Sequence, residues 1–150
     1  AGSAAKVAAC QALGATAINY RETDFEIAFQ NDAMDVILDM AAGDFVPLEL
    51  KALADEGRLV FIAFLRGAKT ELDVNELMRR RLTLTGSTLR PRPVAFKGAI
   101  AARLRERIWP LIEAGKIKPV IYKTFALAEA AEAHRLMETN AHIGKLVLAL

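Results

Sequence analysis

The residues best suited to hold a ligand lie at the start of the chain. Ser3 is placed to cap a helix that follows it, and Lys6 falls in the first turn of that helix. Free backbone N–H groups, a hydroxyl and an ammonium group together favour a phosphate. A capped helix with one early lysine is also a common structural arrangement, so this feature alone does not define a site.

Residues 1–6 also indicate which dinucleotide, NAD or NADP, the chain would prefer. Folds that prefer NAD place a carboxylate near the end of the second strand, where it holds the ribose diol and repels the extra phosphate of NADP. Residues 1–6 contain no acid and do contain Lys6, which favours NADP. Tyr20, farther along, is placed either to contact a ribose or phosphate, or simply to be half-buried at a strand end.

Other reactive side chains do not form a recognisable catalytic set. Asp39 is interpreted as a buried, hydrogen-bonded carboxylate that shapes a strand end. The strand hydroxyls near Ser87 have no suitably placed histidine partner, so no catalytic triad is predicted. His142 precedes Ile-Gly in a loop, where it either reaches a ligand or is solvated.

Composition excludes several classes of protein. Cys10 is the only cysteine and the two histidines are well separated, so neither an intrachain disulfide nor a zinc site is predicted. Twenty basic against eighteen acidic residues, without long like-charge blocks, argue against a nucleic-acid or membrane partner. The chain has no apolar stretch of membrane-spanning length and no signal-peptide pattern at its start, so we expect a cytoplasmic protein.

These residues are positioned by alternating strands and helices. The apolar run 34–40 predicts the central strand of a parallel sheet, covered on both faces, and small residues follow it at 41–43. Ligands bind beyond the carboxyl ends of such strands. Further strands are predicted at 17–20, 58–64 and 82–89, with helices at 4–13, 24–29, 47–54 and 74–80. The fold class is therefore α/β, a partial Rossmann-type doubly wound parallel sheet.

The last third of the chain breaks this alternation. A long helix is predicted over 93–114, bent at Pro110, and is followed by an extended segment at 119–125. An alanine-rich helix over 127–138 and a final strand at 146–150 complete the chain. This tail indicates a return to a different domain.

Short motifs along the chain carry a family resemblance. They are Ala1-Gly2-Ser3 with Lys6, Leu13-Gly14-Ala15, Ile18-Asn19-Tyr20, Asp35-Val36-Ile37-Leu38-Asp39, Gly57-Arg58-Leu59-Val60, Thr85-Gly86-Ser87-Thr88-Leu89-Arg90 and Ile143-Gly144-Lys145. Their order and rough spacing resemble the carboxyl-terminal half of zinc-independent quinone oxidoreductases of the medium-chain dehydrogenase/reductase superfamily. Within it, the chain is similar to the zeta-crystallin-like and p53-inducible group.

The resemblance implies NADPH-dependent hydride transfer to a quinone or a conjugated carbonyl, without zinc. It implies an incomplete dinucleotide-binding domain over 1–115 and a return segment of the GroES-like catalytic domain over 116–150. The chemistry in this family belongs mainly to the cofactor, so no catalytic residue is assigned. A homodimer formed through strand 82–89 is also expected.

Cofactor-binding residues follow from the resemblance position by position. Those for the adenosine phosphate end are Gly2, Ser3, Lys6 and Tyr20. Those that line the middle of NADP(H) and its nicotinamide are Ala42, Gly43, Ala63, Phe64 and Leu65, with Ser87, Thr88 and Leu89 nearby and His142 on the returning tail.

The chain also departs from the family pattern. It has neither the amino-terminal substrate domain nor the glycine-rich turn that takes the pyrophosphate. We therefore expect weak cofactor binding and no useful turnover by this chain alone. The alternative function is a non-catalytic module, which either dimerises through the edge strand 82–89 or binds a dinucleotide without turning it over.

Overall fold

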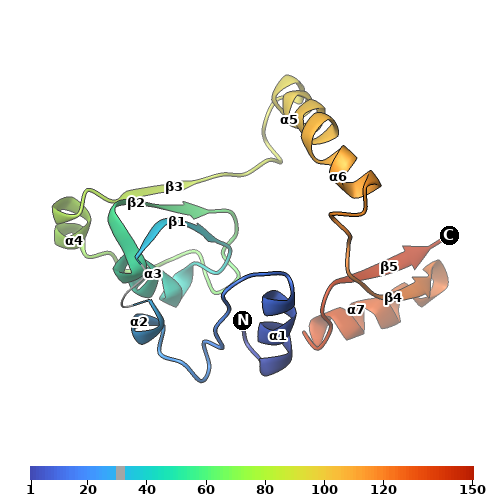
Figure 1. The fold of residues 1–150 in the computed structure, drawn as a ribbon, viewed down its shortest axis with the longest axis horizontal. Helices are drawn as coiled ribbons and strands as arrows, with labels where there is room; N and C mark the ends of the chain where they lie inside the picture. The colour runs from blue at the N-terminus through green and yellow to red at the C-terminus, as the bar shows by residue number, and fades with distance from the viewer. Residues whose placement is uncertain (30–32) are drawn as a thin grey trace. The chain divides into compact units, whose positions relative to one another are not determined.

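The computed structural model describes residues 1–29 and 33–150, and the chain divides into two compact units (Figure 1). The units are Ala1–Arg92 and Pro93–Leu150. The contacts therefore divide the chain earlier than residue 115, where we predicted the domain boundary. That boundary concerns which family domain each segment belongs to, and it stays a prediction.

The first unit is built on a parallel sheet of three strands, as the alternating sequence predicted. The strands are β1 (Met34–Asp39), β2 (Leu53–Phe61) and β3 (Thr83–Gly86), in the spatial order β1-β2-β3. The helices are α1 (Ala4–Ala12), α2 (Phe25–Ala28), the 3-10 helix η1 (Gly43–Phe45), α3 (Val46–Ala52) and α4 (Val74–Arg79).

The core of this unit lies between α3 and the sheet. Val46 and Leu50 of α3 are buried against Leu53 and Leu59 of β2, and Leu82 closes the cluster. Each such side chain contributes about 2 kcal/mol by leaving water. Because only residues 40–45, which include η1, separate β1 from α3, this packing also holds the loop at the carboxyl end of β1.

Our prediction that β1 is the central strand is wrong for this chain. β2 lies between β1 and β3, and no described strand pairs with the other edge of β1. Val36 and Leu38 are 58% and 61% exposed, whereas Asp39 on the opposite face is buried. The apolar run indicated a strand, but its place in the sheet depends on neighbours that the run does not encode.

The predicted strand at 17–20 does not form. The amino group of Ala1 donates to the Ile18 carbonyl at 2.7 Å, and the Tyr20 N–H donates to the Ala1 carbonyl at 3.1 Å. These two bonds hold the segment against the chain start. A strand needs a continuous ladder with a neighbour, and the described residues provide none here.

β2 begins earlier and ends earlier than predicted. The register passes from Met34 opposite Leu53 to Val36 opposite Arg58, so the residues between form a bulge that contains Glu56 at φ 63°. The helix before it therefore ends at Ala52, not at 54, and the strand ends at Phe61.

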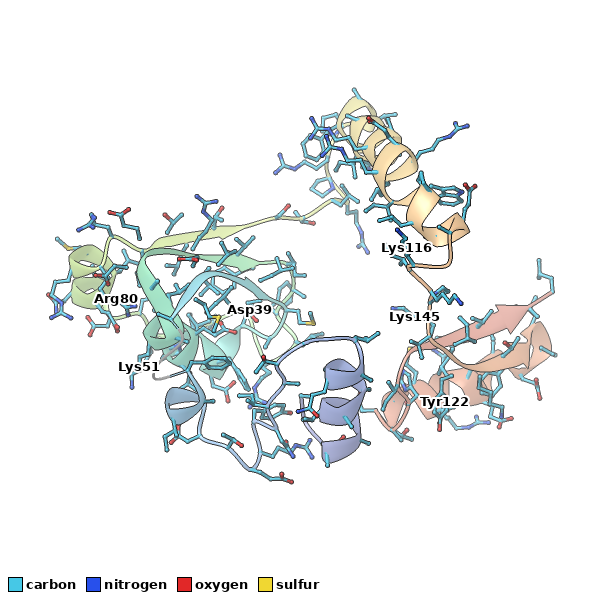
Figure 2. The ribbon with its side chains drawn as sticks, viewed as in Figure 1. Asp39, Lys51, Arg80, Lys116, Tyr122 and Lys145 are labelled. Carbon is cyan, nitrogen blue, oxygen red and sulfur yellow. The ribbon has the colours of Figure 1, made fainter. Side chains whose placement is uncertain are left out.

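Arg80 joins the segments around this bulge. Its guanidinium donates to the carbonyls of Leu50 and Leu53 and to the carboxylates of Asp55 and Glu76. Figure 2 shows Arg80 and Lys51 at the end of the sheet opposite Asp39. The amino end of the sheet is thereby tied to α3 and α4.

β3 is shorter than the predicted strand 82–89. Its pairing with β2 runs from Thr83 opposite Arg58 to Gly86 opposite Phe61. The Ser87 N–H donates to the Phe61 carbonyl at 2.9 Å, and β2 ends there. β3 therefore ends at the residue that lies opposite the end of its partner strand, β2.

The second unit contains α5 (Val94–Arg107), α6 (Trp109–Glu113), β4 (Ile121–Ala126), the 3-10 helix η2 (Leu127–Glu129), α7 (Ala130–Glu138) and β5 (Lys145–Ala149). β4 and β5 pair in parallel, and Phe125 and Ala133 are buried in this unit. The long predicted helix is interrupted at Ile108, which leaves Pro110 in the first turn of α6, where a missing N–H is tolerated. None of the described helices has the length and apolar character that crossing a membrane requires.

Candidate functional site

Two loops meet at the carboxyl edge of the first unit's sheet. One follows β1 at residues 40–43 and the other follows β2 at 62–67. Three N–H groups of the second loop donate to carbonyls of the first chain segment: Ile62 to Asp39 at 2.8 Å, Leu65 to Met40 at 3.1 Å, and Arg66 to Ala41 at 2.8 Å. The loops therefore form one continuous rim where a parallel sheet binds its ligands.

A pocket of about 220 Å³ opens between these loops. Its lining includes Ala42, Gly43, Ala63 and Phe64, all four of which the sequence predicted, together with Val46, Phe61, Ala68 and Thr70. The lining is mainly apolar, so the pocket suits a flat, weakly polar ring. Leu65 does not line it and is 79% exposed.

The backbone of the first loop is tightly constrained. Ala42 adopts φ 55° and ψ −149°, a region that costs a non-glycine residue about 1–3 kcal/mol. A Cβ on Gly43 would lie 2.6 Å from the Arg66 carbonyl oxygen, so the two backbones touch at this point. Only a glycine allows this approach.

Asp39 holds the constrained loop in place. Its carboxylate is 2% exposed and accepts the Ala41 N–H at 2.5 Å and the Ala42 N–H at 2.8 Å. Figure 2 shows the residue at the rim end of the sheet. The interpretation of Asp39 as a buried carboxylate that shapes the strand end is confirmed.

A second buried carboxyl group adjoins the first. Glu49 of α3 is 6% exposed, and burial raises its pKa to about 7, with the charge of Asp39 and a hydrogen bond to Asp39 adding to the effect. Its Oε2 atom is buried and has no hydrogen-bond partner among the described residues. Sequence reasoning missed Glu49. The available signal was its position on the helix face shared by Val46 and Leu50.

The predicted phosphate site at the chain start is partly assembled. The Ser3 hydroxyl accepts the Lys6 N–H at 3.4 Å, which confirms the helix cap. A Cβ on Gly2 would lie 3.0 Å from the Tyr20 hydroxyl, so Gly2 packs closely against that ring. Gly2, Ser3 and Tyr20 thus lie together, and half-buried Lys6 follows one turn along α1.

An aromatic and cationic cluster links this region to the rim. The rings of Tyr20 and Phe45 meet edge to face at 5.4 Å, and the Arg66 guanidinium lies 4.9 Å from the Phe45 ring centre. Arg66 also forms two 2.6 Å bonds with the Asp44 carboxylate, which lowers the pKa of Asp44. Sequence reasoning missed the roles of Asp44, Phe45 and Arg66, although all three lie in or just after the loops that end β1 and β2.

The remaining predicted residues are more dispersed. Ser87 lies beside the end of β2 through its bond to Phe61. Thr88 and Leu89 are exposed and do not line the pocket. His142 belongs to the second unit, where its ring lies 6.2 Å from that of Tyr122 and its buried Nδ1 has no hydrogen-bond partner among the described residues. The roles of these four residues at a cofactor stay predictions, as do those of all the other predicted cofactor-binding residues.

Metal-ligating side chains are not clustered in the described part of the chain. No group of three or more histidine, cysteine, aspartate or glutamate residues there is arranged to hold a metal ion. Whether the whole protein works without zinc stays a prediction, because other ligands would come from outside these residues.

Known families and proteins match the chain over most of its length. Residues 13–148 match the family described as zinc-binding dehydrogenase. Polyketide synthase GfsB from Streptomyces halstedii is 34% identical over 133 residues, which cover 87% of this chain and 2% of that protein. The quinone oxidoreductase of Mus musculus is 26% identical over 145 residues, which cover 88% of this chain and 40% of that protein.

Solved structures agree on the fold. An NAD-dependent alcohol dehydrogenase is 29% identical with a TM-score of 0.75, covering 100% of this chain and 42% of its own. A Pseudomonas syringae quinone oxidoreductase, at 21% identity and a TM-score of 0.77, covers 100% of this chain and 47% of its own, and shows the fold alone. The chain spans less than half the length of each of these relatives.

Proposed function

Because this chain belongs to the zinc-binding dehydrogenase family, in the quinone oxidoreductase branch of the medium-chain superfamily, we propose that it forms part of an NADPH-dependent oxidoreductase. The proposed reaction transfers a hydride from NADPH to a quinone or a conjugated carbonyl compound. A bound nicotinamide dinucleotide would supply that hydride. The protein itself would bind the cofactor and the acceptor, orient them and keep water away from them.

The observation that carries this proposal is a continuous strip within the first unit. It runs from the capped start of α1 through Tyr20, Phe45 and Arg66 to the pocket beside Phe64. The helix start offers backbone N–H groups for a phosphate, and the pocket offers apolar walls for a ring. An elongated ligand with a phosphate at one end and a flat ring at the other matches this arrangement of groups.

The residues present also fit a dinucleotide in size. A pocket of about 220 Å³ is smaller than the roughly 300–1,000 Å³ that whole ligands occupy, so it suits one ring with the remainder outside. Phe61 and Phe64 on its walls would pack against that ring. Gly43 keeps the rim narrow, because its backbone contacts that of Arg66.

The proposed preference for NADPH rests on the start of α1. Residues 1–6 carry Lys6 and no acid, and the Ser3 hydroxyl lies at the first turn of the helix. The additional phosphate of NADPH would be attracted to the ammonium group and the helix amides.

Replacing Lys6 tests this preference. We expect Lys6→Ala in the complete protein to raise the Kd for NADPH about tenfold, a loss of about 1.4 kcal/mol, and to change the Kd for NADH little. The measurement is a fluorescence titration with each nucleotide. Lys116→Ala removes an exposed lysine of the second unit and is the matched control. An equal effect of Lys6→Ala on both nucleotides would contradict the proposal.

The acceptor is a quinone or a conjugated thioester. The chain is similar both to a polyketide synthase, at 34% identity, and to the mouse quinone oxidoreductase, at 26%, so both kinds of acceptor are tested. NADPH oxidation by the complete protein, measured separately with a benzoquinone and with a short enoyl thioester, distinguishes the two. No oxidation with either would favour the non-catalytic module.

We also propose that the segment 82–89 pairs with its twin in a homodimer. β3 lies at an edge of the described sheet, so its outer backbone groups are available for pairing. Sedimentation of the complete protein measures this directly.

A further inference from the structure

Two acidic side chains share one buried site beneath the pocket. Asp39 and Glu49 are 2% and 6% exposed, and burial, the charge of Asp39 and hydrogen bonding to Asp39 together raise the pKa of Glu49. Two ionised carboxylates in contact repel each other strongly in a buried site, so one of them must carry a proton there. Burial raises the pKa of Glu49, so the proton is placed on Glu49, while Asp39 accepts two backbone N–H groups.

The site contains no competing cation among the described residues. η1, β2 and α2 pack against α3. Their charged side chains are paired elsewhere or exposed: Asp44 with Arg66, Asp55 with Arg80, Glu56 with Arg81, and exposed Arg58, while Lys51 on α3 itself is exposed. The side chain of Glu26 on α2 lies outside the described residues. Asp39 is thus the charged group that acts on Glu49.

The loop above this pair depends on Asp39. Ala42 is held in a costly backbone conformation, and its N–H is bonded to Asp39 Oδ2 at 2.8 Å. Ala42 and the adjoining Gly43 also line the pocket. Any change that disturbs the Asp39 carboxylate is therefore transmitted to the pocket wall by two backbone hydrogen bonds.

We propose that Glu49 is a positioning residue for the pocket: with its proton it donates to Asp39 and fixes residues 41–43, and without its proton it releases them. The proposal deepens the function proposed above, because it makes dinucleotide binding sensitive to pH. Glu49 itself touches no ligand. It acts through Asp39 and the loop.

The direction of the pH effect follows from the raised pKa. The folded chain holds the Glu49 proton more tightly than the unfolded chain does. Glu49 therefore contributes its full stability below about pH 4.5, and this contribution is lost as the pH rises through about 7. The loop should be fixed under mildly acidic conditions and loosened under alkaline ones.

Hydrogen exchange at the Ala41 and Ala42 amides tests the proposal without a ligand. In the wild-type chain, their protection factors should fall about tenfold or more between about pH 6 and pH 8.5. Glu49→Gln keeps a neutral donor of the same shape, so its protection should stay nearly constant. Glu71→Gln, at an exposed carboxylate, should behave like the wild type. The same pH dependence in wild type and Glu49→Gln would overturn the proposal.

NADPH titrations at the same pH values provide the second readout. The ratio of the wild-type Kd to the Glu49→Gln Kd should rise about tenfold between about pH 6 and pH 8.5, and the ratio cancels the titration of the ligand's own phosphate. A flat ratio would overturn the link to the pocket. Absence of NADPH binding at every pH, with the expected exchange behaviour, would support the Glu49 switch and contradict the proposed function instead.

Discussion

The two loops at the rim of the pocket are fixed in contrasting ways. The loop after β1 is short and anchored from below by a buried carboxylate, Asp39. The loop after β2 is longer and held from the side, by bonds to the first loop and by the exposed pair of Arg66 with Asp44. The buried carboxylate therefore holds the first loop, and the first loop in turn holds the second loop through backbone hydrogen bonds.

Because a buried group holds the first loop, we expect the largest loss of stability when Asp39 is replaced. Asp39→Ala leaves one buried and one part-buried amide without partners, at about 1–3 kcal/mol each, so we expect the free energy of unfolding to fall by about 2–6 kcal/mol. Urea denaturation measures this. Asp35→Ala, at an exposed position of the same strand, is the control and should have little effect. Comparable losses in both variants would show that Asp39 is not the anchor.

A smaller effect is expected where the loops touch. Gly43→Ala places a Cβ 2.6 Å from the Arg66 carbonyl at φ 59°, so the two loops must separate at a cost of about 1–3 kcal/mol. Thermal denaturation and ligand titration together measure the loss of stability and of the pocket. Ala42→Gly, one residue earlier, relieves strain and should not destabilise the chain. An unchanged Gly43→Ala chain would mean that the loops are not in contact.

The smallest effect is expected at the side of the second loop. Arg66→Ala removes an exposed ion pair with Asp44, and such pairs contribute little because solvent and salt screen them. We expect a slight fall in Tm at low salt that disappears at about 1 M salt. A fall in Tm that does not depend on salt and is as large as the fall in Asp39→Ala would contradict this view. It would show that the second loop, and not the first, holds the rim in place.

Local signals in the sequence predicted local structure well. α1 and α4 start at Ala4 and Val74, where the sequence predicted helices, and the side chains of Ser3 and Asp73 cap them by accepting nearby N–H groups. The alternation of helices and strands likewise predicted the parallel sheet. These features depend on neighbours along the chain, which the sequence displays directly.

Features that depend on neighbours in space were predicted less well. The central position of β1 and the strand at 17–20 both required partner strands that the described residues do not provide. The resemblance to a known family predicted that Ala42, Gly43, Ala63 and Phe64 bind the cofactor; all four line the pocket, and their role at a cofactor stays a prediction. The resemblance did not indicate Glu49, because a single acid in an apolar helix becomes informative only when Asp39 is known to lie beneath it.

Arg80 imposes a chemical constraint on the opposite end of the sheet. Its planar guanidinium group donates hydrogen bonds to two carbonyls and two carboxylates that belong to separate segments. An ammonium presents all its donors from a single point and cannot span such a set. Although lysine has the same charge, this corner of the protein accepts arginine alone.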